Sequence, residues 1–180
     1  MSKKLIWFTA LLVAVTVVVS VLYCMGRGEV FLTLAITFGT FAYHFVMRLL
    51  VALVFSSVMH NKADYNKRWY RVGKAEMALY NKLKIAGWKG RVPTYDPSQF
   101  DPRLHSWDEI AQAMCQAELV HETIVLLSFV PLVECLWFDA HVVFVVTSVL
   151  AAAFDLMFVA IQRYNRTRIV RLLERKNKAK

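Results

Sequence analysis

The sequence predicts an all-α integral membrane protein, a bundle of four transmembrane helices that forms a single membrane domain over residues 1–180. Of the 180 residues, 58% are hydrophobic and only 19% are charged, which is too apolar for a soluble domain of this length. Four segments are apolar over about 20 residues, the length that crosses a bilayer. Most basic residues lie beside these segments, as is typical of residues at a membrane surface.

The first two predicted spans, residues 5–25 and 30–59, form a helical hairpin. The N-terminus resembles a signal peptide in its charge order, but its apolar stretch is longer than usual and no A-x-A cleavage site follows, so we expect a retained helix. Only Gly26 to Glu29 separate the two spans. Because so short a connection forms a tight turn, the two helices should be antiparallel, and the longer second helix should tilt or project beyond the bilayer.

The other two predicted spans are residues 110–130 and 141–161. The third is less obvious from hydropathy because several glutamine, glutamate and histidine residues interrupt it. The fourth is strongly apolar apart from Asp155 and is predicted to continue helically into a basic tail, residues 163–180.

Between the second and third spans, residues 60–105 form the main extramembrane loop. Part of this loop is predicted to be an amphipathic helix that lies on the membrane, with basic residues on one side and apolar residues on the other. The apolar positions are Trp69, Val72, Leu79, Tyr80 and Leu83. Glu76 projects near the middle of this apolar stripe, so it either serves a functional site or pairs with a nearby arginine or lysine.

The distribution of basic residues predicts the orientation of the helices. Lys3, Lys4, the basic loop and the basic tail all fall on one side, whereas the other connections carry only Arg27 and acidic residues. By the positive-inside rule, both termini and the large loop should be cytoplasmic. The net charge of +9 then indicates contact with anionic lipid headgroups or an acidic carrier and not with nucleic acid.

Polar residues inside the spans mark the candidate site, because a charge at membrane depth costs roughly 2.5–3.5 kcal/mol. Glu118, His121 and Glu122 have helical spacing that places them on one broad side of the third span. Carboxylates beside a histidine can fix its tautomer and raise its basicity, which suits it to remove a proton from an alcohol. The alternative is a structural hydrogen-bond network that joins the helices.

We expect no metal site. Glu118 and His121 match the Glu-x-x-His unit of di-iron bundles, but these sites need a second such unit and the chain contains none. Its three cysteines stand far apart without C-x-x-C spacing, which indicates neither zinc nor a disulfide framework.

Two further groups of polar residues lie in the second and fourth spans. His44 and Arg48 are one helical turn apart, and Arg48 either pairs with Asp155 or Glu118 or holds an anionic substrate. In the fourth helix, Asp155, Gln162 and Arg166 share one face. The cluster Gln162, Arg163, Tyr164, Asn165 and Arg166 follows where the helix should leave the bilayer, and it has more hydrogen-bonding capacity than anchoring requires.

Five short segments carry a family resemblance. They are Tyr70 with Glu76, the run Tyr80 to Ile85, the run Trp88 to Pro93, the segment Ala117 to Glu122, and the run Gln162 to Arg166. In this order they resemble the small bacterial membrane proteins named after glycosyl-4,4'-diaponeurosporenoate acyltransferase, which esterifies a sugar hydroxyl with a fatty acyl chain in staphyloxanthin synthesis. The resemblance runs from roughly residue 41 to 173.

This resemblance implies an acyltransferase in the bacterial plasma membrane. The enzyme would move a fatty acyl group from a thioester of coenzyme A or acyl carrier protein to a hydroxyl of a lipid-linked or glycolipid acceptor, with no bound cofactor. His121 would be the general base, Glu118 or Glu122 its orienting partner, His44 with Arg48 a polarising or anion-holding pair, and Glu76 a residue that closes the site. The alternative is a non-enzymatic membrane module that binds lipid headgroups or a partner protein.

The remaining residues expected near the substrate lie in the loop and along the fourth helix. Lys89, Arg163 and Arg166 would receive the phosphates of coenzyme A or the acidic face of a carrier protein. The full set of expected substrate-binding residues is Arg48, Trp88, Lys89, Asp155, Gln162, Arg163, Tyr164, Asn165 and Arg166.

Overall fold

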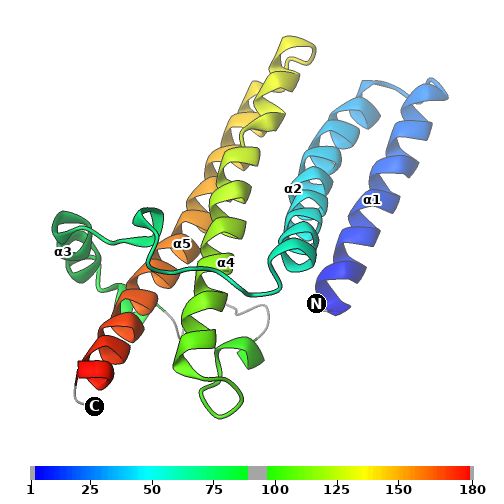
Figure 1. The fold of residues 1–180 in the computed structure, drawn as a ribbon. Coiled ribbons are helices and arrows are strands. Elements are labelled where there is room, and N and C mark those ends of the chain that lie inside the picture. Colours follow the sequence, from blue (N-terminus) through cyan, green and yellow to red (C-terminus); the bar gives the residue numbers. More distant parts are fainter. Residues whose placement is uncertain (1–2, 89–96, 179–180) are drawn as a thin grey trace. The chain divides into compact units, whose positions relative to one another are not determined.

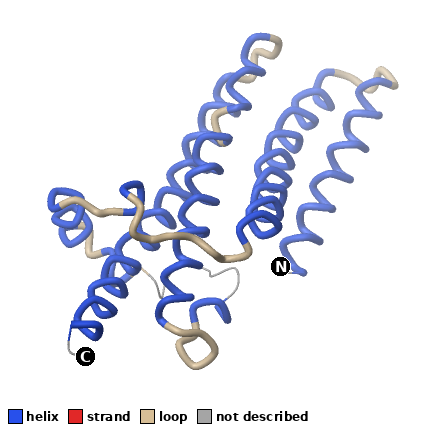
Figure 2. Tube along the Cα trace, in the orientation of Figure 1, coloured by secondary structure: helices blue, strands red, loops and turns tan. Residues whose placement is uncertain are grey.

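The computed structural model describes residues 3–88 and 97–178, and these are helical or loop throughout, with no strand among them (Figures 1 and 2). The α-helices are α1 (Lys3–Cys24), α2 (Glu29–Met59), α3 (Lys74–Lys82), α4 (Trp107–Leu127) and α5 (His141–Lys178). Short 3-10 helices connect them: η1 (Arg68–Tyr70), η2 (Ile85–Gly87), η3 (Pro97–Phe100) and η4 (Val130–Leu136).

Four helical segments of the described chain are long and apolar enough to cross a membrane, which confirms the predicted spans. The third differs in detail, because α4 begins at Trp107 and ends at Leu127, and η4 continues the segment to Leu136. Pro131 lies in η4 and has no amide hydrogen to donate to an α-helical ladder, so the helix changes type there. The fourth helix extends through the basic tail to Lys178, as predicted.

The chain divides into two compact units. The first unit comprises Met1–Leu53 and Thr123–Phe154, and the second comprises Val54–Glu122 and Asp155–Lys180. Within the first unit, the Tyr43 hydroxyl donates a 2.9 Å hydrogen bond to the carbonyl of Leu127. That carbonyl ends α4 and has no helical donor, so the tyrosine satisfies a polar group that would otherwise be costly in hydrocarbon.

The second unit is built on α4 and α5. Ile110, Ala111 and Met114 of α4 form a buried cluster with Ile169 of α5, and Tyr65 packs against it from the preceding loop. Along α5, the buried residues Asp155, Val159, Arg166 and Ile169 follow one another at intervals of four, seven and three residues, which keep them on one side of the helix. One face of this helix therefore carries both the apolar core and the ionisable groups.

The residues from Trp69 to Leu83 do not form one amphipathic helix as expected. They form η1, an extended residue at Gly73, and the nine-residue helix α3. The residues predicted to form one apolar stripe also differ in burial. Tyr80 is buried with Ile85 and Ile161, whereas Leu79 and Leu83 are exposed. One set of apolar side chains thus packs on α5 and another faces outward.

Candidate functional site

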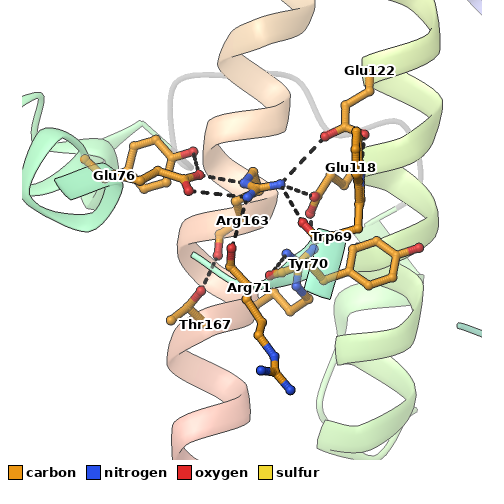
Figure 3. A network of polar contacts seen from close by, with 10 residues as sticks. Trp69, Tyr70, Arg71, Glu76, Glu118, Glu122, Arg163 and Thr167 are labelled. Carbon is orange, nitrogen blue, oxygen red and sulfur yellow. Dashed lines mark hydrogen bonds and ion pairs between the residues drawn. The ribbon is translucent and has the colours of Figure 1, made fainter. Parts of the chain in front are cut away.

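Arg163 of α5 is the centre of an ion-pair network in the second unit (Figure 3). Its Nε lies 2.6 Å from Oε1 of Glu76 on α3, and its Nη1 lies 2.7 Å from Oε1 of Glu118 on α4. Glu122 is more distant, with its Oε1 3.7 Å from Nη1. A single guanidinium therefore connects three helices, a geometry that its planar set of donors allows.

Glu118 and Arg166 form the buried part of this network. Arg166 donates through Nη1 to the second carboxylate oxygen of Glu118, and its Nη2 donates a 2.6 Å hydrogen bond to the carbonyl of Tyr70. Glu118 is 0% exposed and Arg166 is 1% exposed. Because charges buried this deeply persist only when they are paired and hydrogen-bonded, this pair has a structural role.

The segment from Trp69 to Arg71 lies across α4 and α5 and is held there by its main chain (Figure 3). Arg163 donates to the carbonyls of Trp69 (3.3 Å) and Arg71 (3.4 Å), on either side of the Tyr70 carbonyl that Arg166 binds. The Trp69 indole N–H also donates to Oε2 of Glu122 at 2.9 Å. These carbonyls bind arginine donors in place of helical amides, which explains why the predicted helix is interrupted here.

Glu76 takes the second of its two predicted roles, ion pairing with an arginine. Besides Arg163, it accepts a 2.5 Å hydrogen bond from the hydroxyl of Tyr80, one turn later on α3. Burial acts to raise the pKa of Glu76, but the hydrogen bonds from Arg163 and Tyr80 outweigh it, so the pKa is lowered from the ordinary value of 4.5.

This lowered pKa predicts that acid weakens the attachment of α3. A carboxylate whose pKa is lower in the folded state stabilises that state above its unfolded pKa, and the contribution is lost as the pH falls through the folded pKa. We expect the protection factors of α3 amides, which correct for the intrinsic pH dependence of exchange, to fall as the pH drops below about 4.5, the ordinary value for glutamate. In Glu76→Gln, α3 should exchange faster at neutral pH with little further acid response, and identical pH profiles for the two proteins would contradict this account.

A second polar group of the same unit joins His121 of α4 to Asp155 of α5. The Nδ1 atom of His121 lies 2.8 Å from Oδ1 of Asp155, which is 1% exposed. The imidazole is partly exposed and stacks on the ring of Phe158, with centroids 4.5 Å apart and planes at 6°. The carboxylate and the aromatic ring together fix the orientation of the imidazole.

This arrangement corrects the expected partner of His121. We expected Glu118 or Glu122 to orient the imidazole and Asp155 to bind substrate, but Asp155 is the carboxylate at Nδ1. The oxygens of Glu118 bind the two arginines, and Glu122 accepts from Trp69. Spacing along one helix thus did not identify the carboxylate that lies at Nδ1 of His121.

The His121–Asp155 pair has the geometry of a general base with its positioning residue. The Oδ1 atom of Asp155 can accept a hydrogen bond from an N–H group at Nδ1, so we assign the ring proton to Nδ1 on the basis of this contact. The lone pair then lies on Nε2, the atom that can take a proton from a hydroxyl. Phe158 restrains the ring plane, which limits the rotations that would misdirect Nε2.

His44 and Arg48 belong to the first unit. His44 is buried, and the Nη1 atom of Arg48 donates a 3.0 Å hydrogen bond to the His44 carbonyl, while Nη2 lies 3.5 Å from the carbonyl of Ala151. A role for these two residues in holding an anion stays a prediction.

The remaining predicted residues of the second unit have varied surroundings. Tyr164 packs edge-on against Tyr80 at 6.5 Å, and Trp88 packs on the cluster around Ile85. Gln162 and Asn165 are half-buried on α5. Lys89 lies outside the described residues. Arg163 and Arg166, which we expected to bind phosphates, are instead ion-paired within the protein.

The roles of the aromatic residues that support both groups were not predicted from the sequence. Helical spacing alone could have indicated two of them, because Phe158 lies three residues after Asp155 and Tyr80 lies four residues after Glu76. The contact between Trp69 and Glu122 joins residues 53 positions apart, so no local signal predicts it.

Two hollows also occur on the second unit. The larger, about 700 Å³ and wide open, lies between α4 and the preceding loop and is lined by residues that include Lys62, Tyr70 and Leu119. The smaller, about 310 Å³, is lined by residues that include His60 and His105. His121 lines neither of them. Within the described residues, no group of three or more histidine, cysteine, aspartate or glutamate side chains is placed to hold a metal ion.

Both polar groups lie in a region of the chain that matches a known protein family. The family model described as glycosyl-4,4'-diaponeurosporenoate acyltransferase matches residues 66–175, which is more than half of the chain. The match includes both polar groups of the second unit. No curated protein and no solved structure matches the chain.

Proposed function

Because the chain belongs to the glycosyl-4,4'-diaponeurosporenoate acyltransferase family, we propose that it moves a fatty acyl group from an acyl thioester to a hydroxyl of a lipid-linked or glycolipid acceptor. The donor would be a thioester of coenzyme A or of acyl carrier protein. Family membership favours this function over a non-enzymatic module that binds lipid headgroups or a partner.

The observation that carries the mechanism is the 2.8 Å contact between His121 Nδ1 and Asp155 Oδ1. His121 acts as the general base, and its Nε2 takes the proton of the acceptor hydroxyl. Asp155 is a positioning residue that holds the proton on Nδ1 and stabilises the imidazolium that forms. Phe158 keeps the ring plane fixed through its stacking contact.

The reaction can proceed by direct transfer. As Nε2 removes its proton, the acceptor oxygen attacks the thioester carbonyl carbon and forms a C–O bond. The tetrahedral intermediate collapses, the C–S bond breaks, and the leaving sulfur receives the proton from His121. The products are an ester and a free thiol, and His121 returns to its neutral form without a covalent enzyme intermediate.

The arginine–glutamate network supports this site without taking part in the chemistry. Arg163 and Arg166 join α3, α4 and α5 through Glu76 and Glu118. Glu118 lies one turn before His121 on α4, so the network fixes the helix that carries the base. In the proposed orientation, the basic loop and tail place this end of the helices at the cytoplasmic leaflet of the plasma membrane, where acyl thioesters occur.

Purified full-length protein with a radiolabelled acyl thioester and bacterial membrane lipid should produce a labelled ester. In Asp155→Asn we expect kcat to fall by roughly 10²-fold or more while KM changes little, because the imidazolium loses its stabilising negative charge and the amide can donate to Nδ1, which favours the wrong tautomer. The acceptor KM and the melting temperature of each variant separate a positioning effect from misfolding.

A double-variant comparison tests whether Asp155 acts through His121. If it does, adding Asp155→Asn to His121→Ala should lower activity no further than His121→Ala does alone. Additive losses would contradict the assignment of Asp155, and absence of ester with the wild-type protein and varied donors would contradict the proposed function.

A further inference from the structure

The level at which α5 leaves the hydrocarbon can be located from its sequence. The helix is strongly apolar from His141 to Ile161 apart from Asp155, and Arg163 begins the basic part that follows. Arginine residues at the ends of transmembrane helices lie among lipid headgroups. Arg163 therefore marks the membrane interface along α5.

The short helix α3 is fastened to α5 at this level (Figure 3). Its Glu76 bonds to Arg163, and its Tyr80 is buried against Ile161, the last residue of the apolar stretch. These two contacts are made by residues only two positions apart on α5. Together they fix the position of α3 along this helix.

The outward side of α3 combines apolar and basic residues. Leu79 is 51% exposed and Leu83, directly after the helix, is 47% exposed. Exposed lysines lie beside them, Lys82 and Lys84. Glu76 is the only acid between Lys74 and Lys84, and it points toward Arg163 (Figure 3). Every outward charge of this segment is therefore positive.

We propose that this outward side of α3 docks on the anionic headgroup layer of the membrane that the chain spans. Leu79 and Leu83 would enter the boundary between headgroups and acyl chains, while Lys82 and Lys84 contact lipid phosphates. Surface-bound amphipathic helices bind in this way, and anionic lipid attracts clustered lysines. The level fixed by Arg163 and the single sign of the outward charge indicate lipid and not a protein partner as the occupant.

The test uses two label positions on α3 in the full-length protein. Cys24, Cys115 and Cys135 are first replaced by alanine, and a single cysteine is then introduced by Leu79→Cys or, as a matched control, Asn81→Cys. Both native residues are exposed, but they lie about 200° apart around the helix. Each cysteine carries an environment-sensitive fluorophore, and the protein is placed in lipid nanodiscs that contain acyl-chain spin-label quenchers.

We expect the fluorophore at position 79 to emit at shorter wavelength and to be quenched by the lipid several-fold more than the fluorophore at position 81. Equal quenching at the two positions would overturn the proposal. A label at position 79 that is shielded from both the lipid quencher and aqueous iodide would also overturn it, because protein would then cover this side of α3.

The charge contribution is tested by lipid composition. Adding phosphatidylglycerol to phosphatidylcholine nanodiscs should increase the blue shift at position 79, and the combined change of Lys82 and Lys84 to glutamine should abolish this increase. High salt should reduce it as well, since exposed charges are screened. A response to phosphatidylglycerol that survives the double substitution would overturn the role of the lysines.

Discussion

His121→Ala is expected to lower kcat for acyl transfer by roughly 10²- to 10⁴-fold, the usual contribution of a positioned general base. The substitution removes the Nε2 atom that takes the proton of the acceptor hydroxyl, and it leaves Asp155 without its imidazole partner. Initial rates of ester formation with saturating donor and acceptor would measure the loss.

The matched control for this experiment is His105→Ala. His105 is an exposed histidine outside α4, and its replacement should leave the rate unchanged. Circular dichroism and melting temperature should show that His121→Ala still folds. Wild-type kcat in folded His121→Ala would show that a different group removes the proton.

Glu118→Ala should destabilise the protein by about 3–5 kcal/mol, since removing one partner of a buried ion pair leaves uncompensated charge. Arg166 is 1% exposed and has one of its hydrogen bonds to Glu118, so it cannot recover full hydration without disrupting the packing of α4 on α5. Arg163 would keep Glu76 as a partner. Denaturant or thermal unfolding in detergent would measure the change.

Glu174→Ala provides the comparison for Glu118→Ala, because Glu174 is exposed near the end of α5. Exposed substitutions of this kind usually change stability by no more than about 0.5 kcal/mol. If the two variants unfold at the same denaturant concentration, the ion-pair network contributes nothing to stability and its proposed scaffold role is wrong.

Much of the fold could be predicted from the sequence because single-helix properties are local. Runs of about 20 apolar residues require helices in a bilayer, and the four predicted spans correspond to α1, α2, α4 with η4, and α5. The segment from Trp69 to Leu83 was harder to predict, since its course depends on where two arginines of α5 bind the carbonyls of Trp69, Tyr70 and Arg71.

The candidate site, like the fold, was predictable only where its features belong to a single helix. The i, i+3 and i+4 spacing of Glu118, His121 and Glu122 places them on one broad side of α4, and this follows from helical geometry alone. Which residue of α5 faces each of them depends on the register and rotation of one helix against the other. At about 1.5 Å and 100° per residue, a shift of a single position exchanges the partners.

The sequence by itself thus determined the four apolar helical spans, the cost of burying these ionisable groups and the placement of Glu118, His121 and Glu122 on one broad side of α4. Only the tertiary structure decided that Asp155 orients His121 and that Arg163 and Arg166 neutralise Glu118. The physical reason is that a buried charge is stable only when it is paired. Which residue pairs with it depends on how helices far apart in the chain pack together.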